Sequence, residues 1–289
     1  MSKLFREMQE TTGGAAPPTV SAALTELLTA VQTDTEITRK ATSTPLIGCQ
    51  TVSLPELKRP ILSTAEEDST THTAFESYRS LRTKITRLQS AQGIRSLVIS
   101  SAVSGEGKTV SALNLAISLA QLETQRVLLV DGDIRTAGMS SVAGVAEKRG
   151  LSEFLQGNCT FEKAVLATNI ARLYMVSAGE PTSAASDLFA CAKWKEFIGR
   201  CNEVFDMVIV DCPPILGLAD FDLISSTCDG VLIVVRARKT KRETLTEISQ
   251  HLQGKKVVGV VLNGQEKRPS AYYGYHYYSR PRTSPAEKA

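Results

Sequence analysis

Short runs of consecutive aliphatic residues recur from residue 95 onward, and stretches with apolar residues at helical spacing lie between them. Continuous Val, Ile and Leu runs are typical of parallel strands that helices cover on both faces. We therefore predict strands at 97–101, 127–131, 173–177, 207–211, 231–236 and 257–262. The alternation indicates an α/β fold, a doubly wound and mostly parallel sheet that binds its ligands at the carboxyl ends of the strands.

The predicted helices have recognisable start signals. Thr240 with Glu243 matches a capping box at the start of a helix over 240–253, and Thr73 with Glu76 matches another. The helix that Thr73 would open places four apolar residues on one side, namely Tyr78, Leu81, Ile85 and Leu88. Further helices are predicted at 110–122 and 187–203.

Three regions of the chain differ in pattern. Residues 61–266 carry the alternating strands and helices, and we expect them to form one domain. Residues 267–289 follow the last predicted strand and are rich in proline, which predicts a flexible tail. Residues 1–60 predict a poorly ordered extension with one short amphipathic helix, whose apolar face is Val20, Leu24, Leu27, Leu28 and Val31. Docking of that helix on a partner and packing on its own domain both stay open.

The segment Ala102-Val103-Ser104-Gly105-Glu106-Gly107-Lys108-Thr109 lies between the first predicted strand and a predicted helix. It fits the phosphate-loop pattern, with Ala102 in place of the usual first glycine. In such a loop the amides at the helix N-terminus hold phosphates, the lysine reaches the outer phosphates and the threonine hydroxyl ligates Mg²⁺. We predict that ATP and Mg²⁺ bind here through Ser104, Gly105, Glu106, Gly107, Lys108, Thr109 and Val110.

Acidic residues follow two of the predicted strands. One strand ends at Asp131, with Asp133 two residues later, and another ends at Asp211. Because Mg²⁺ prefers oxygen ligands, we expect Thr109, Asp133 and Asp211 to hold it, Asp211 through water. Asp131 or Asp133 would then orient or deprotonate an attacking hydroxyl beside Lys108, the third catalytic candidate. The alternative is that these aspartates are helix caps or turn residues.

Composition narrows the class of protein. The 289 residues are 42% hydrophobic and 22% charged, as in an ordinary globular protein, and the apolar runs are too short for a membrane helix. Six scattered cysteines and three histidines favour a reducing cytosol without a Cys/His metal site. The net charge is +3, but residues 236–289 carry twelve Lys or Arg against four Glu. That excess suits either an anionic membrane surface or acidic partner, or simple solubility.

Five of the seven tyrosines lie within seven residues of the tail: Tyr272, Tyr273, Tyr275, Tyr277 and Tyr278. Exposed tyrosines on a basic tail can accept phosphoryl groups, and basic residues among aromatics can also bind single-stranded nucleic acid. An ATP site in the same chain favours the acceptor role, so we expect no nucleic acid partner.

Glu76, Arg79 and Arg82 share one edge of the predicted helix that begins at Thr73. By spacing alone this is most simply an exposed intrahelical ion pair, worth about 0.3–0.5 kcal/mol. Pairing with the same edge of another subunit is the alternative.

Taken together, the phosphate loop, Val130-Asp131-Gly132-Asp133-Ile134-Arg135, Val210-Asp211-Cys212-Pro213-Pro214 and the tyrosine tail resemble the bacterial tyrosine kinases of exopolysaccharide and capsule biosynthesis. The resemblance covers residues 73–278 and implies ATP-dependent autophosphorylation of the tail tyrosines between subunits. It implies that Glu76, Arg79 and Arg82 form a subunit contact in a homo-oligomeric ring. In related ATPases the position of Asn263 reads the adenine base.

The resemblance also implies partners and a location. Without membrane segments, the chain resembles the stand-alone cytoplasmic form of these kinases. Such a kinase is activated by a membrane chain-length regulator, a polysaccharide co-polymerase, at the inner face of the plasma membrane. A cognate tyrosine phosphatase would reverse the modification. Ser104 stands where relatives often carry proline, and this should have little effect because no phosphate-binding amide is lost.

Two other functions stay open. A dimerising switch ATPase of the partitioning or division-site (ParA/MinD-like) type shares the sheet and the three motifs. Such ATPases usually carry an extra lysine early in the loop, where this chain has Val103, and they leave the tyrosine cluster unexplained. A nucleotide-bound scaffold that recruits polysaccharide machinery through its basic tail is the other possibility.

Overall fold

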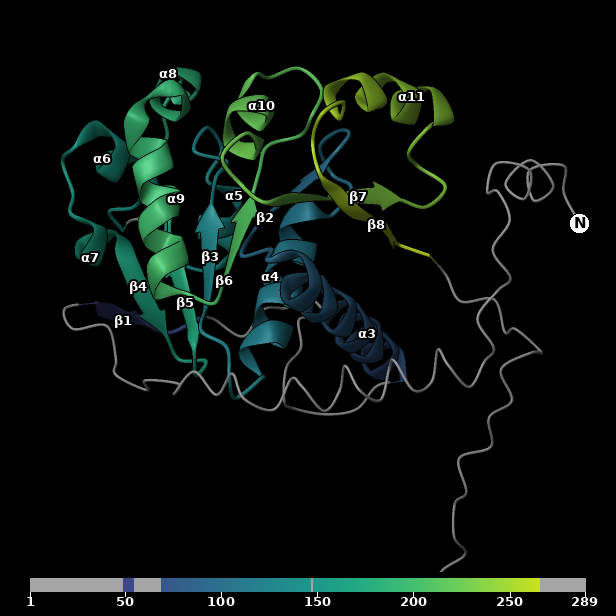
Figure 1. Ribbon diagram of the computed structural model, residues 1–289, viewed down its shortest axis with the longest axis horizontal. Coiled ribbons are helices and arrows are strands. Elements are labelled where there is room, and N and C mark those ends of the chain that lie inside the picture. The colour runs from purple at the N-terminus through teal and green to yellow at the C-terminus, as the bar shows by residue number, and fades with distance from the viewer. Residues whose placement is uncertain (1–48, 55–68, 147, 266–289) are drawn as a thin grey trace, which may run out of the picture. The chain divides into compact units, whose positions relative to one another are not determined.

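The computed structural model describes residues 49–54, 69–146 and 148–265. Their strands form one sheet in the order β1-β4-β5-β3-β6-β2-β7-β8 (Figure 1). All neighbouring pairs are parallel except β4 with β5. The strands are β1 Gln50–Val52, β2 Ser96–Ser101, β3 Val127–Asp131, β4 Val165–Thr168, β5 Leu173–Val176, β6 Met207–Asp211, β7 Gly230–Arg236 and β8 Val257–Asn263.

The helices of the described residues lie on both sides of this sheet, as the continuous apolar strands predict. They are α3 Ser69–Gln92, α4 Lys108–Ala120, α5 Gly138–Val142, α6 Leu151–Gln156, α7 Phe161–Ala164, α8 Ala185–Ala190, α9 Ala192–Val204, α10 Asp220–Ser225 and α11 Arg242–His251. None of them is long and apolar enough to cross a membrane. The predicted doubly wound, mostly parallel sheet is confirmed.

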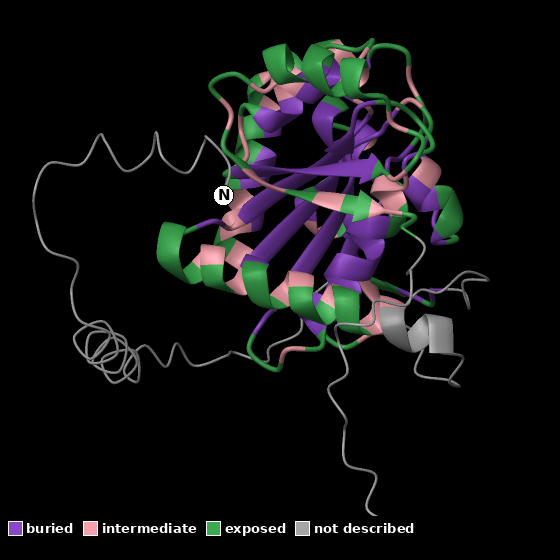
Figure 2. Ribbon diagram, turned by 90° about the vertical axis from the view of Figure 1, so that its right-hand side faces the viewer, coloured by how far each residue is buried: buried purple, intermediate pink, exposed green. Residues whose placement is uncertain are grey.

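Successive residues of the inner strands alternate between two hydrophobic cores. Val98 and Val208 belong to a core that also contains the aromatic side chains of α6 to α10, among them Trp194. Leu97 and Ile209 belong to the opposite core, under α3, α4 and α5. Figure 2 shows the resulting layer of buried strands between helices whose outer faces are exposed. Burial on both faces holds the carboxyl ends of these strands rigidly, and the site lies there.

Six strands occur where the sequence predicts them, within one residue at most ends. β1 and β4 were not predicted, because three or four residues carry too little pattern. The stretch 187–203 is two helices, because Cys191 is extended and separates α8 from α9.

Both predicted capping boxes are wrong. Helix α3 begins at Ser69, so Thr73 lies inside it and cannot be the N-cap. Helix α11 begins at Arg242 with Lys241 as its N-cap, and the Thr240 hydroxyl bonds elsewhere, as described below. The predicted helix over residues 20–31 lies outside the described residues.

Candidate active site

The phosphate loop connects β2 to α4 at the carboxyl edge of the sheet. β6 pairs with both β2 and β3, and Asp131 and Asp211 are register partners at the ends of β3 and β6. The two acidic strand ends therefore lie beside the loop, as predicted from the sequence.

Two glycines give the loop its shape. Gly105 has φ 82° and Gly107 has φ 97°, in the left-handed region that other residues rarely adopt. Gly107 also lies so close to Asn263 that an added Cβ would clash with the Nδ2 atom of that side chain. Gly107 is the N-cap of α4, so the free amides of the first helical turn are available to an anion.

Lys108 is the centre of the charge arrangement. Its Nζ lies 3.3 Å from Asp133 Oδ2, 3.6 Å from Asp211 Oδ1 and 3.4 Å from Thr109 Oγ1. Burial lowers the pKa of this ammonium, but Asp211 and Asp133 outweigh burial and raise it above its usual value. The lysine therefore stays charged and marks the place where phosphate would be neutralised.

Asp211 is fully buried, and neither carboxylate oxygen has a hydrogen-bond partner of normal geometry among the described residues. Desolvation raises its pKa to about 7, against the attraction of Lys108. The Thr109 hydroxyl is near enough to lower that pKa without making such a bond. A buried carboxylate with unused oxygen atoms beside a hydroxyl fits the ligand preference of Mg²⁺.

A protein-only metal cage is absent from the part of the chain that the structure describes, because no three His, Cys, Asp or Glu side chains there converge on one point. Mg²⁺ commonly takes one or two carboxylates and completes its shell with phosphate oxygens and water. Thr109, Asp133 and Asp211 fit that kind of site.

The two aspartates of the second motif have different surroundings. Asp131 is completely buried and accepts hydrogen bonds from Ser140 N at 2.8 Å, Ser140 Oγ at 2.6 Å and Asp133 N at 3.2 Å. Burial raises its pKa, and the bonds from Ser140 oppose that rise. Asp133 has a side chain that is 9% exposed and faces Lys108. Of the two candidates for the base, Asp133 is the more accessible to a hydroxyl that would accept a phosphoryl group.

Arg135 organises a network for which the sequence suggested no role. Its guanidinium donates to Asp220 from Nε at 2.6 Å and Nη2 at 3.2 Å, to Ser183 O and to Ser186 Oγ. Asp220 is buried, and Arg135 holds its pKa below the usual value against desolvation. The D-x-D-x-R spacing was the available signal for Arg135. Nothing in the sequence indicated Asp220.

The other predicted site residues differ in burial and in their distance from the loop. Ser104 and Val110 are exposed at the loop, whereas the Glu106 side chain is buried and accepts from Val103 N. Asn263 ends β8 and donates from Nδ2 to Glu106 O at 2.9 Å. It therefore lies at the loop, and adenine recognition stays a prediction. The five tail tyrosines lie outside the described residues.

The predicted subunit-contact edge on α3 is divided. Glu76 and Arg79 are exposed and pair with each other at 3.1 Å, and Arg79 also lies over the Phe75 ring. Arg82 instead donates to Ser118 O of α4 at 2.8 Å within the same chain. Glu76 and Arg79 are thus accessible to a second copy, while Arg82 is tied to the helix that begins with Lys108.

Comparison with known proteins places this site in a family. The model of an AAA domain, AAA_31, matches residues 94–258. The tyrosine-protein kinase YwqD of Bacillus subtilis (strain 168) is 32% identical over 203 residues, which are 70% of this chain and 85% of that protein. This chain belongs to the family of bacterial tyrosine-protein kinases.

Solved structures agree with the assignment to the tyrosine-protein kinases. The kinase domain of Escherichia coli tyrosine kinase ETK aligns with a TM-score of 0.65 at 25% identity, covering 79% of this chain and 94% of that one. The septum site-determining protein MinD of Pyrococcus horikoshii, complexed with Mg-ADP, aligns with a TM-score of 0.50 at 26% identity. That alignment covers 58% of this chain and 69% of MinD. The phosphate-loop fold is therefore shared with MinD, and the tyrosine-kinase likeness extends over more of the chain.

Proposed function

We propose that the protein is an ATP-dependent tyrosine kinase that phosphorylates the clustered tyrosines of its own tail in a neighbouring subunit, and thereby regulates exopolysaccharide polymerisation and export. The observation that carries the proposal is the convergence of Lys108, Asp133 and Asp211 at the phosphate loop of a chain in this family. The Asp211 oxygens accept no hydrogen bond from the described residues. Phosphoryl transfer requires mainly positioning and charge stabilisation, and these groups supply both.

In the proposed reaction, the loop amides and Lys108 hold the phosphates of ATP. Thr109, Asp133 and Asp211 would hold Mg²⁺, which would supply positive charge beside the transferring group. Asp133 orients the tyrosine hydroxyl and accepts its proton as the phenolic oxygen bonds to the γ-phosphorus. The bond between that phosphorus and the β,γ-bridging oxygen breaks, which releases ADP and leaves phosphotyrosine.

The oligomer and its partners belong to the same proposal. Glu76 and Arg79 are exposed on α3 and suit a contact with a second copy in a ring, with Arg82 fixing α3 to α4. A membrane chain-length regulator would activate the kinase at the inner face of the plasma membrane, and a tyrosine phosphatase would reset it. Each phosphate adds roughly −1.5 to −2 charge to a basic tail, which would weaken its docking and loosen the ring.

The decisive experiment uses the seven tyrosines of the chain. The variant with Tyr272, Tyr273, Tyr275, Tyr277 and Tyr278 changed to Phe should lose all label from γ-labelled ATP, in the presence of the membrane regulator of the same cell. The matched control changes the other two, Tyr78→Phe and Tyr174→Phe, and should label like wild type. Full labelling of the five-fold variant would refute tail phosphorylation.

The distant MinD likeness supports a second candidate, a dimerising switch ATPase. Val103 is 40% exposed where such ATPases usually place a lysine. The variant Val103→Lys introduces that lysine and therefore tests this candidate. If wild type hydrolyses ATP only above a threshold protein concentration and forms no phosphotyrosine, the switch ATPase is the better description.

A further inference from the structure

The turn 236–241, which runs from the last residue of β7 to the N-cap of α11, lies against the phosphate loop through two side chains. Arg236 donates from Nη1 to Gly105 O at 2.9 Å, and the Thr240 hydroxyl donates to Glu106 Oε1. Neither contact belongs to the reaction described above. Both join a turn near the edge of the sheet to a loop that is more than 130 residues away in sequence.

Glu106 is the residue that this turn reaches. It is fully buried, and its other carboxylate oxygen, Oε2, accepts from Val103 N at 3.1 Å. The carboxylate thus connects the first residues of the loop to Thr240. A buried carboxylate is costly unless hydrogen bonds satisfy it, so the loop conformation that buries Glu106 depends on these two donors.

The turn is itself firmly held, as a support must be. Thr240 Oγ1 also accepts from Arg236 N at 3.0 Å, and Ala237 N donates to Asn263 O at 2.8 Å. Arg238 at its tip has φ 61°, a left-handed conformation that persists in non-glycine residues only where the surroundings impose it.

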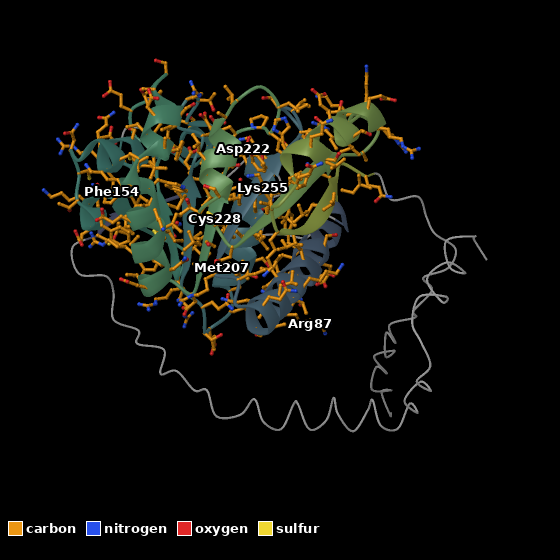
Figure 3. The ribbon with its side chains drawn as sticks, turned by 45° about the horizontal axis from the view of Figure 1, so that its top comes forward. Arg87, Phe154, Met207, Asp222, Cys228 and Lys255 are labelled. Carbon is orange, nitrogen blue, oxygen red and sulfur yellow. The ribbon has the colours of Figure 1, made fainter. Side chains whose placement is uncertain are left out.

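The edge that carries the turn is anchored to the body of the domain. Lys255, just before β8, contacts Asp222 Oδ1 of α10 at 3.1 Å and lies 5.3 Å from the centroid of the Phe221 ring. Figure 3 labels Asp222 and Lys255. Asn263, at the end of β8, then donates to Glu106 O. The loop is therefore braced from β7, from the turn and from β8.

We propose that Thr240 and Arg236 are positioning residues that hold the phosphate loop in its nucleotide-binding conformation, with buried Glu106 as the connection. We call these contacts of Thr240 and Arg236 with the loop the brace. The inference rests on the proposed function for the identity of the nucleotide, but the brace itself requires only that the ligand carries phosphate. Neither side chain reacts. They act through the Gly105 carbonyl and the Glu106 carboxylate, so their loss raises the dissociation constant for nucleotide.

The test measures binding of the fluorescent nucleotide mant-ADP with Mg²⁺ to the full chain. Thr240→Val keeps the shape but removes the donor, and should weaken binding about tenfold. Thr240→Ser restores the hydroxyl and should bind within about twofold of wild type. Thr246→Val is the matched control, because the Thr246 hydroxyl donates within α11, to Arg242 O. This variant is expected to leave binding unchanged.

A second variant protects the test against misfolding. Arg236→Ala lies at an exposed residue and should weaken mant-ADP binding about threefold. The matched control Arg87→Ala, at an exposed position of α3, should leave binding unchanged. Wild-type affinity for mant-ADP in both Thr240→Val and Arg236→Ala would overturn the brace. So would weak mant-ADP binding by a Thr240→Ser variant that is folded. If wild type forms no phosphotyrosine but Thr240→Val still loses mant-ADP affinity, the kinase proposal falls and the brace stands.

Discussion

The centre and the edge of the sheet differ sharply in how they hold the same site. Every residue of β2, β3 and β6 is buried, whereas along β8 Val257, Val260 and Leu262 are 40%, 64% and 53% exposed. The centre presents Lys108, Asp133 and Asp211 from rigid, two-sided packing. The edge contributes Arg236, Thr240 and Asn263 through hydrogen bonds, and water can compete for these bonds. We infer that residues at the centre carry out phosphoryl transfer and that residues at the edge adjust the affinity for nucleotide.

The largest expected effect comes from the central charge. Lys108→Met should reduce tail labelling about 10³-fold, because it removes the cation that meets both the phosphates and the carboxylates. The matched control is Lys84→Met, at an exposed position of α3. Labelling of Lys108→Met at the wild-type rate would mean that the catalytic centre lies elsewhere.

The second prediction separates the two aspartates. Asp133→Asn should lower the rate of tail labelling by about 10²–10³-fold with little change in the free energy of unfolding, since Asp133 is the reachable base. Asp131→Asn should instead lower that free energy by about 1–3 kcal/mol, because the buried bonds from Ser140 are disturbed. Urea denaturation and labelling of both variants make the check. Equal stability losses would contradict the division of roles.

The third prediction tests the packing difference directly. Ile209→Ala in β6 should cost about 2–5 kcal/mol of unfolding free energy, since Ile209 is completely buried between strands and helices. Val260→Ala on the exposed face of β8 should cost less than about 0.5 kcal/mol. Denaturant unfolding of both gives the comparison. A large loss at Val260 would show that something covers this face in solution.

The smallest predicted effect depends on pH and on the protein free of nucleotide and metal. The pKa of Asp211 rises from 3.8 to about 7 on folding, so the folded protein keeps a proton that the unfolded chain releases. Stability from this group therefore falls as pH rises from about 4 to 7, and the penalty is complete above 7. Asp211→Asn should raise the unfolding free energy at pH 8 by about 1–3 kcal/mol and change it little at pH 4.

Asp187→Asn, the same substitution at an exposed position, serves as the control for the change of residue itself. Asp211→Asn should also lose Mg²⁺-dependent nucleotide binding, so a more stable protein binds its ligand less well. If Asp211→Asn is destabilising at pH 8, then Lys108 stabilises the charged carboxylate more than burial opposes it.

The local sequence pattern was sufficient to predict those elements that carry their own signal. The aliphatic runs of β2, β3 and β6 and the spacing from Ala102 to Thr109 predicted the sheet, the loop and the acidic strand ends. Thr240 shows the limit of this approach. It matches a capping box with Glu243, yet its hydroxyl donates to Glu106 and its oxygen accepts from Arg236 N. The buried Glu106 carboxylate needs a protein donor, whereas the exposed first amides of α11 can bond to water instead.

By itself, the sequence determined the α/β class and predicted the phosphate loop and the three aspartates of the candidate site, because strand burial and phosphate binding leave marks within short segments. Only the tertiary structure decided that Asp131 is enclosed by Ser140 while Asp133 faces Lys108, that Arg135 pairs with Asp220, and that Arg82 bonds to α4. These contacts join residues between 9 and 85 positions apart in the chain, and no local pattern encodes which donor a buried acceptor will meet.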